Sequence, residues 1–339
     1  MPGSTSSPST ASRLSSLIQN ATSNPQHIPG LVVQVVDRHG NTEYSSASGI
    51  RGLGVEEPMT TDTVFWVASC TKLFSAIALM KLVEQGQADL DSADLLEDFV
   101  HELKDIQILK NGKLRPKANR ITLRMLMTHV GIDWPLGMAN TSFVPSRELR
   151  SKMAILHQRG ETLAARPHLY GPAREEMEGV FQSAGAGLLS TAPDYSRVLS
   201  MILNGGVSPH TQQRILLQET VHQMFQNQIP DYMTKHVGVA QGVSRHDLVV
   251  PPTVEPVPVA GYFGWGLNFE LQANPKALNP ALCEKEGFPR GSAAGLSNCF
   301  WTVDREKGVA AVCMTQILPF GDTYVLPLWQ ELQEVIFED

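Results

Sequence analysis

The sequence has little that would place it in a membrane or on a nucleic acid. It contains no apolar run long enough to span a bilayer. Its 339 residues carry 27 Lys and Arg against 34 Asp and Glu, which gives a net charge of −7. Such a chain lacks the basic surface that binds phosphate backbones or anionic lipids. We therefore expect no nucleic-acid partner and no membrane span.

Cysteine is also scarce. The four cysteines show neither the spacing of a metal site nor the density of a disulfide scaffold, so we expect reduced thiols and no metal bound by cysteines. They are Cys70, Cys283, Cys299 and Cys313. The first 17 residues contain one Arg and no apolar core segment, unlike a secretory signal. The expected location is therefore cytoplasmic.

The remaining composition is that of a globular protein, with 42% apolar residues and a length that can bury a sizeable core. Residues 1–12 are rich in Ser, Thr and Pro and predict a disordered tail, and residues 13–339 predict a single domain. We expect the sheet to come from residues 28–68 and 260–339, and a helical region to span about 69–225. The domain would then be discontinuous in sequence.

Turn residues and apolar periodicity predict individual elements. Gly40 and Asn41 separate the two strands of a hairpin, with Asn41 suited to a positive φ, and Lys110–Lys113 can form a second, smaller turn. The predicted strands are 31–37, 42–48, 264–271, 298–304 and 308–316, and the predicted helices are 12–21, 121–131, 195–203, 212–226 and 325–337.

One stretch, residues 64–90, has a pattern that points to chemistry. Apolar residues recur at helical spacing after Ser69, and the pattern ends at Gly86, a common C-terminal stop. Ser69 and Lys72 are three residues apart, so their side chains share one face of the helix. A structural alternative is a Ser that caps the helix, followed by a Lys on the surface.

The Ser-x-x-Lys pair predicts nucleophilic catalysis. A serine hydroxyl needs a base to take its proton, and a lysine desolvated among apolar neighbours is neutral enough to act as one. The amide of Ser69 lies at the helix N-terminus, where it can stabilise an oxyanion. Cys70 points about 100° away from Ser69 around the helix, so we interpret it as a core residue.

Ser-x-x-Lys is the nucleophile motif of serine β-lactamases and penicillin-binding proteins. The wider segment FWVASCTKLFSAIALMKLVEQGQADLD resembles the fungal esterase and transesterase branch of that superfamily. The resemblance implies a β-lactamase/transpeptidase-like α/β (α+β) fold, with an antiparallel sheet flanked by helices. It returns in the segment ITLRMLMTHVG and from Phe181 to the end of the chain.

The resemblance also implies a tyrosine in a Tyr-x-Asn motif that relays the serine proton, and this sequence departs from that pattern. No tyrosine lies between Tyr44 and Tyr170, and Gly131 runs directly into a segment that matches the family well beyond the motif. The helical subdomain is therefore predicted to be shortened. Substitutes to consider are Tyr170, Asp133 and Asn140, whereas His129 is better explained as a helix-end residue that caps carbonyls.

The segment Ala293–Asn298 resembles the family's third active-site element, a strand beside the nucleophile. By that resemblance the amide of Gly295 is the second oxyanion donor, and glycine permits the close backbone approach that this role needs. Ala293 stands where relatives often carry a cationic or aromatic residue. This argues against β-lactam and D-Ala-D-Ala substrates, which carry a carboxylate, and makes a peptidase or β-lactamase the least favoured function.

The sequence therefore predicts a serine acyltransferase or esterase that acts on small acyl esters or thioesters. The resemblance to the fungal branch implies a role in the biosynthesis of a fungal polyketide or terpenoid. Its partners would be a small-molecule acyl donor and acceptor, and an acyl carrier domain or acyl-CoA is a candidate donor. The alternative is a catalytically impaired or inactive relative that has lost the tyrosine element. The acyl-enzyme chemistry itself requires no cofactor.

Overall fold

We describe a computed structural model of the chain. The structure describes residues 9–105, 107–110, 113–116, 120, 136–169, 183–228, 245, 247–249, 263–273, 283 and 287–337. The predicted helix 121–131 with His129, and the candidates Asp133 and Tyr170, lie outside these residues. Among the helices of the described part, none combines the length and apolar character that crossing a membrane requires.

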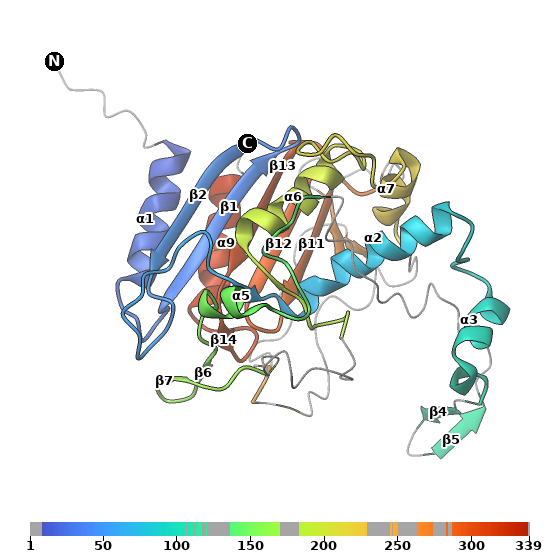
Figure 1. The fold of residues 1–339 in the computed structure, drawn as a ribbon, viewed down its shortest axis with the longest axis horizontal. Helices are drawn as coiled ribbons and strands as arrows, with labels where there is room; N and C mark the ends of the chain where they lie inside the picture. Colours follow the sequence, from blue (N-terminus) through green and yellow to red (C-terminus); the bar gives the residue numbers. More distant parts are fainter. Residues whose placement is uncertain are drawn as a thin grey trace.

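A seven-stranded sheet forms the centre of the molecule, and all of its neighbouring strands pair antiparallel (Figure 1). Its strand order is β2-β1-β13-β12-β11-β10-β9. The bounds are β1 (Gly30–Asp37), β2 (Thr42–Gly49), β9 (Phe263–Trp265), β10 (Glu270–Gln272), β11 (Arg290–Gly295), β12 (Cys299–Asp304) and β13 (Val309–Met314). As predicted, strands from both ends of the chain share this sheet.

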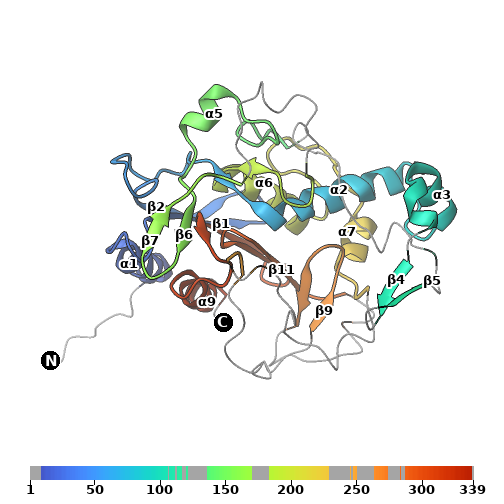
Figure 2. The ribbon, with the colours of Figure 1, turned by 90° about the horizontal axis from the view of Figure 1, so that it is seen from below.

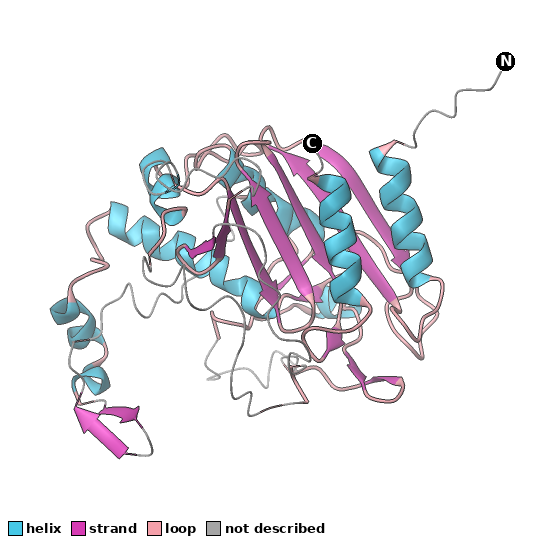
Figure 3. Cartoon of the chain, turned by 180° about the vertical axis from the view of Figure 1, so that it is seen from behind, coloured by secondary structure: helices cyan, strands magenta, loops and turns pink. Residues whose placement is uncertain are grey.

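Helices cover both faces of the sheet, so its central strands are buried on both sides. Helices α1 (Thr10–Thr22) and α9 (Val325–Ile336) lie side by side on one face (Figure 3). Helices α2 (Thr71–Glu84) and α6 (Ala192–Leu203) lie on the other face (Figure 2). In β1, Val32 and Val36 pack beneath α2 and α6, whereas Val33 and Val35 pack beneath α1 and α9. This double burial explains why β1 is apolar almost throughout.

The remaining elements surround this core. At the far end of α2, α3 and the hairpin of β4 and β5 extend away from the sheet (Figure 1). These smaller elements are α3 (Ala93–Phe99), β4 (Gln107–Lys110), β5 (Lys113–Pro116), α5 (Arg147–Ser151), β6 (His157–Arg159), β7 (Leu163–Ala165), β8 (Leu189–Ser190), α7 (Gln218–Met224), β14 (Ile317–Leu318), and single 3₁₀ turns at Ala68–Cys70 and His101–Lys104.

The structure confirms the predicted hairpins and the terminal helix, but it corrects several boundaries. Helix α1 begins at Thr10, inside the predicted tail 1–12, because the Ser9 hydroxyl caps it. In the first turn it is Gly40, with φ +81°, that takes the left-handed conformation we assigned to Asn41. The predicted strand 264–271 is instead the hairpin of β9 and β10, which turns at Asn268 with φ +71°.

Two further predicted elements span more residues than the observed ones. The helix predicted over 212–226 is α7, which starts only at Gln218, because the preceding residues form a loop closed by a bridge between Val207 and Arg214. The sheet segment predicted over 28–68 ends at Gly49. Strand β3 (Phe65–Trp66) lies outside the main sheet and pairs with β8, which takes the chain directly into the turn that carries Ser69.

Candidate functional site

The candidate nucleophile lies on a single 3₁₀ turn, Ala68–Cys70, between β3 and α2. Ala68 has φ +45°, a conformation that is rare for residues with a side chain and that aims the chain sharply into the helix. The residue before this turn is fixed by a backbone hydrogen bond, because the amide of Val67 donates to the carbonyl of Leu188 at 3.0 Å. Residues 73–80 of helix α2 are all buried, as expected for a helix that lies in the core.

Ser69 and Lys72 lie in contact, as their spacing predicted. Lys72 Nζ is 2.9 Å from Ser69 Oγ and donates a hydrogen bond to the carbonyl of Gly185 at 2.8 Å. Both side chains are half-buried. Burial lowers the pKa of Lys72 below its ordinary value, because the ammonium form loses solvation. The pair therefore has the geometry of a nucleophile and its base.

The turn of residues 183–188 supplies the acceptor for Lys72. Residues 183–187 are all small, Ser-Ala-Gly-Ala-Gly, and their backbone makes specific contacts. The carbonyls of Ala184, Gly185 and Ala186 each accept a side-chain hydrogen bond, from Ser75, Lys72 and Trp66 respectively. All three donors come from residues 66–75, which lead into the nucleophile turn or follow it. These contacts are tertiary, so the spacing of the small residues gave no signal for them.

Gly295 lies at the end of β11, directly beside the nucleophile turn. A Cβ atom at this position would be 2.3 Å from the carbonyl oxygen of Val67, so only glycine allows this approach. The turn after Gly295 is tied to β3, because Ser297 Oγ donates to the carbonyl of Trp66 at 2.8 Å. Gly295 is thus held next to the turn that carries Ser69, and the role of these two amides as oxyanion donors stays a prediction.

The side chain of Gln316 completes this link. Its Nε2 donates to the carbonyl of Trp66 at 2.9 Å, and its Oε1 accepts from the amide of Trp66 at 3.3 Å. A side-chain amide therefore pairs with β3 in the way that a neighbouring strand would. This pairing explains why β3 can leave the main sheet and still have partners on both sides. Sequence reasoning gave no role to Gln316 or Ser297.

A hollow of about 540 Å³ opens beside Ser69 and Lys72. It includes residues on both faces of β11, since Ala293 packs beneath α2 and Ala294 beneath α9. Aromatic rings and side-chain amides form most of its lining: Trp265, Phe269, Phe300, Trp301, Trp329, Asn268, Gln272, Gln330 and Gln333. Among its described lining residues, Glu270 is the acidic group and Lys72 the basic one. Burial raises the pKa of the Glu270 carboxyl.

Cys70, Tyr195 and the candidate Asn140 make contacts that leave them outside the Ser69–Lys72 pair. Cys70 is buried, and burial raises the pKa of its thiol well above the ordinary value, so it stays an unreactive thiol. The hydroxyl of Tyr195, on α6, donates to the carbonyl of Cys70 at 2.8 Å and supports the turn from below. Asn140 lines a different hollow, and its backbone N–H donates to Asp194 Oδ2 at 2.7 Å.

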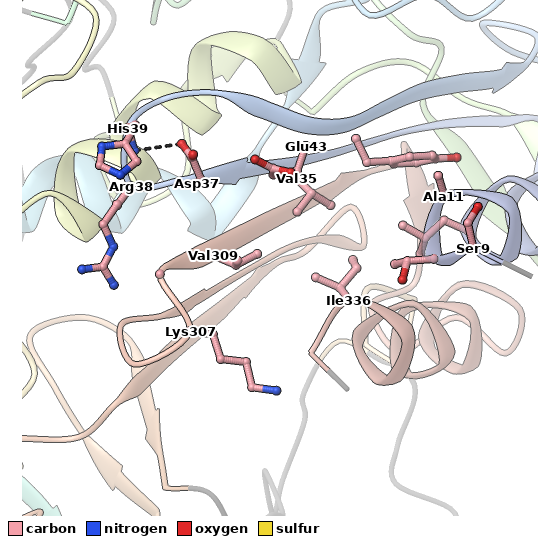
Figure 4. Close-up of a pocket in the computed structure, with 14 residues that line it drawn as sticks. Ser9, Ala11, Val35, Asp37, Arg38, His39, Glu43, Lys307, Val309 and Ile336 are labelled. Carbon is pink, nitrogen blue, oxygen red and sulfur yellow. Dashed lines mark hydrogen bonds between the residues drawn. The ribbon is translucent and has the colours of Figure 1, made fainter. Parts of the chain in front are cut away.

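A further hollow, of about 670 Å³, lies between the start of α1, the turn of β1 and β2, and the end of α9 (Figure 4). Its polar groups are engaged in structural contacts. Asp37 accepts from the amides of His39 and Asn41, Arg38 donates to the carbonyl of Arg305, and Lys307 donates to the carbonyl of Phe337. It therefore offers no nucleophile paired with a base. Within the described ranges, no cluster of His, Cys, Asp and Glu is arranged to hold a metal ion.

Comparison with known proteins gives this site a context. The Beta-lactamase family profile matches residues 17–131. Over nearly the whole chain, the structure superposes on a mutant of simvastatin synthase from Aspergillus terreus with a TM-score of 0.76, covering 98% of each chain at 19% identity. The fold is β-lactamase-like. In this fold Ser69 and Lys72 occupy the start of the central buried helix, and β11 is the strand beside it.

At the sequence level the chain resembles fungal acyltransferases and esterases. It is 29% identical over 206 residues to the acyltransferase calJ of Penicillium decumbens, a match that covers 53% of this chain and 46% of calJ. It is 36% identical over 110 residues to the lovastatin esterase of Penicillium rubens, covering 30% of this chain and 27% of that protein. The matched part of the chain thus spans less than half of these relatives.

Proposed function

We propose that this chain is a serine acyltransferase or esterase that works through an acyl-enzyme on Ser69. The observation that carries the proposal is the 2.9 Å contact between Ser69 Oγ and Lys72 Nζ, beside a hollow large enough for a small acyl ester. The names of the relatives, an acyltransferase and an esterase, support the same class of reaction.

In the proposed first step, Ser69 Oγ attacks the carbonyl carbon of an ester or thioester while its proton moves to neutral Lys72. The electron pair displaced onto the carbonyl oxygen is stabilised by the amides of Ser69 and Gly295. When the tetrahedral intermediate collapses, Lys72 gives its proton to the leaving alcohol or thiol. The product is an acyl-Ser69 ester.

In the second step, an alcohol or water attacks the acyl-Ser69 ester and Lys72 acts as base again. An alcohol gives transfer, and water gives hydrolysis. We infer that the acceptor is an uncharged, largely apolar alcohol such as a fungal polyketide or terpenoid. The lining supports this, because it joins aromatic rings with amides, and Glu270 would oppose a substrate carboxylate. An acyl carrier domain or acyl-CoA remains the proposed donor.

The experiment that tests the proposal is intact-mass spectrometry of the folded protein after incubation with p-nitrophenyl acetate and p-nitrophenyl butyrate. We expect one acyl adduct, mapped to Ser69 by peptide analysis and missing in Ser69→Ala. The control is Ser200→Ala, another buried serine, which should keep the adduct. A folded protein that forms no adduct would instead support the alternative, a relative inactivated by loss of the tyrosine.

A further inference from the structure

The contacts around Lys72 form a ladder of three successive carbonyls. Ser75 Oγ donates to the carbonyl of Ala184 at 2.7 Å, Lys72 Nζ to that of Gly185 at 2.8 Å, and the indole N–H of Trp66 to that of Ala186. Two residues further on, the amide of Leu188 donates to the hydroxyl of Thr71 at 3.2 Å. The turn is therefore fixed at four points by β3 and the first two turns of α2.

The central contact decides how Lys72 can act. A carbonyl only accepts hydrogen bonds, so one N–H of Lys72 must point at Gly185 in both the charged and the neutral form. In neutral Lys72 the lone pair is then left free to face Ser69 Oγ, 2.9 Å away. The Gly185 carbonyl thus orients the base as a carboxylate orients the histidine of a Ser-His-Asp triad.

The Gly185 carbonyl needs support of its own, because a turn rich in alanine and glycine has few side chains to fix it. Ser75 lies one helical turn beyond Lys72 and is 1% exposed. Its hydroxyl bonds the carbonyl directly before that of Gly185. Without this bond, the buried Ala184 carbonyl would lose the hydroxyl that donates to it. We therefore expect the turn to move away from Lys72.

We propose that Ser75 is a positioning residue for this reaction, and that its hydroxyl holds the turn 183–188 so that the Gly185 carbonyl orients Lys72 toward Ser69. The inference rests on the acyl-enzyme function proposed above. Ser75 touches neither substrate nor reacting atoms. It acts through the turn, so it should affect the chemical step more than substrate binding.

The test compares Ser75→Ala with wild type and with Ser200→Ala. Ser200 is a matched control because it is also fully buried in a helix, α6, and its hydroxyl bonds the carbonyl of Arg197 in its own helix. For each folded protein, the rate constant for acylation of Ser69 by p-nitrophenyl butyrate is measured by stopped flow over a range of substrate concentrations, with mass spectrometry to verify the adduct.

We expect Ser75→Ala to lower the maximal acylation rate constant about tenfold, a fraction of what complete loss of a base costs. Its half-saturating substrate concentration should stay within about twofold of wild type, and Ser200→Ala should keep the wild-type rate. A rate for Ser75→Ala within twofold of wild type, or an equal loss in Ser200→Ala, would overturn the positioning role alone. No Ser69 adduct in wild type would overturn the proposed function and this role with it.

Discussion

The backbone at Gly295 shows how the lack of a side chain permits two segments to approach closely. The clearance to the carbonyl of Val67 leaves no room for a methyl group, so the close approach of β11 to the nucleophile turn depends on glycine. This is a local requirement that a sequence can reveal once the position is known. The sequence alone cannot show that the carbonyl facing Gly295 belongs to Val67.

We predict that Gly295→Ala slows acylation of Ser69 by about 100-fold, because β11 must move away and its amide leaves the oxyanion. The measurement is the pre-steady-state rate with p-nitrophenyl acetate. Gly160→Ala is the control, since a Cβ there meets nothing nearer than the carbonyl of Thr162 at 4.0 Å. Equal rates for Gly295→Ala and wild type would show that this amide does not bind the oxyanion.

The protonation state of Lys72 gives a second prediction at this scale. Only the neutral amine can take the proton of Ser69, so acylation should become faster as pH rises through the pKa of Lys72. Because burial lowers that pKa, the midpoint should lie below the ordinary lysine value of about 10.4.

Lys72→Met removes the base and should lower the acylation rate by about 10²- to 10⁴-fold and abolish this dependence on pH. Lys81→Met is the control, because Lys81 is on the same helix and pairs with Glu84. A midpoint at the ordinary value in wild type, or a Lys72→Met protein with an unchanged profile, would exclude Lys72 as the base.

At the scale of single elements, β3 depends on side chains that lie more than 200 residues away in sequence. Gln316 makes two hydrogen bonds to the backbone of Trp66, and Ser297 makes one. We predict that Gln316→Met lowers the free energy of unfolding by about 1–3 kcal/mol, because it removes two buried bonds. Ser297→Ala should cost about 1 kcal/mol, since the Trp66 carbonyl keeps its bond from Gln316.

Urea denaturation of wild type and both variants measures the free energies of unfolding and checks that Gln316→Met loses more than Ser297→Ala. A control is Gln228→Met, whose side chain bonds carbonyls of its own segment at Gln223 and Gln226. If Gln316→Met were as stable as wild type, or if Ser297→Ala were the less stable of the two variants, the assignment of β3 to this side-chain pairing would be wrong.

The elements themselves divide into those that the sequence predicts and those that it does not. Helix α2, the hairpin of β1 and β2 and the hairpin of β12 and β13 follow from apolar period and turn residues, which are local signals. The pairing of Ser69 with Lys72 is also local. The contact of Lys72 with the Gly185 carbonyl and the position of β3 outside the main sheet depend on segments that are distant in sequence. A local sequence pattern therefore cannot predict them.

At the scale of the whole molecule, the sheet joins the two ends of the chain, because β1 pairs with β13. We predict that a fragment of residues 1–228 does not fold cooperatively, since β1 would keep only β2 as a partner and would expose its apolar residues. Circular dichroism during urea titration should show a cooperative transition for the full chain and none for the fragment. A cooperative transition in the isolated fragment would contradict the prediction that it cannot fold.

Because the chain is synthesised from its N-terminus, the early strands of the sheet are made well before their later partners. Ser69 and Lys72 emerge more than 220 residues before Gly295, Ser297 and Gln316, which complete their surroundings. A nascent chain therefore carries Ser69 through that whole interval without Gly295, the proposed second oxyanion donor. Over the same interval β1 has no β13 to pair with, which makes the unfinished chain a natural client for chaperones that bind exposed apolar strands.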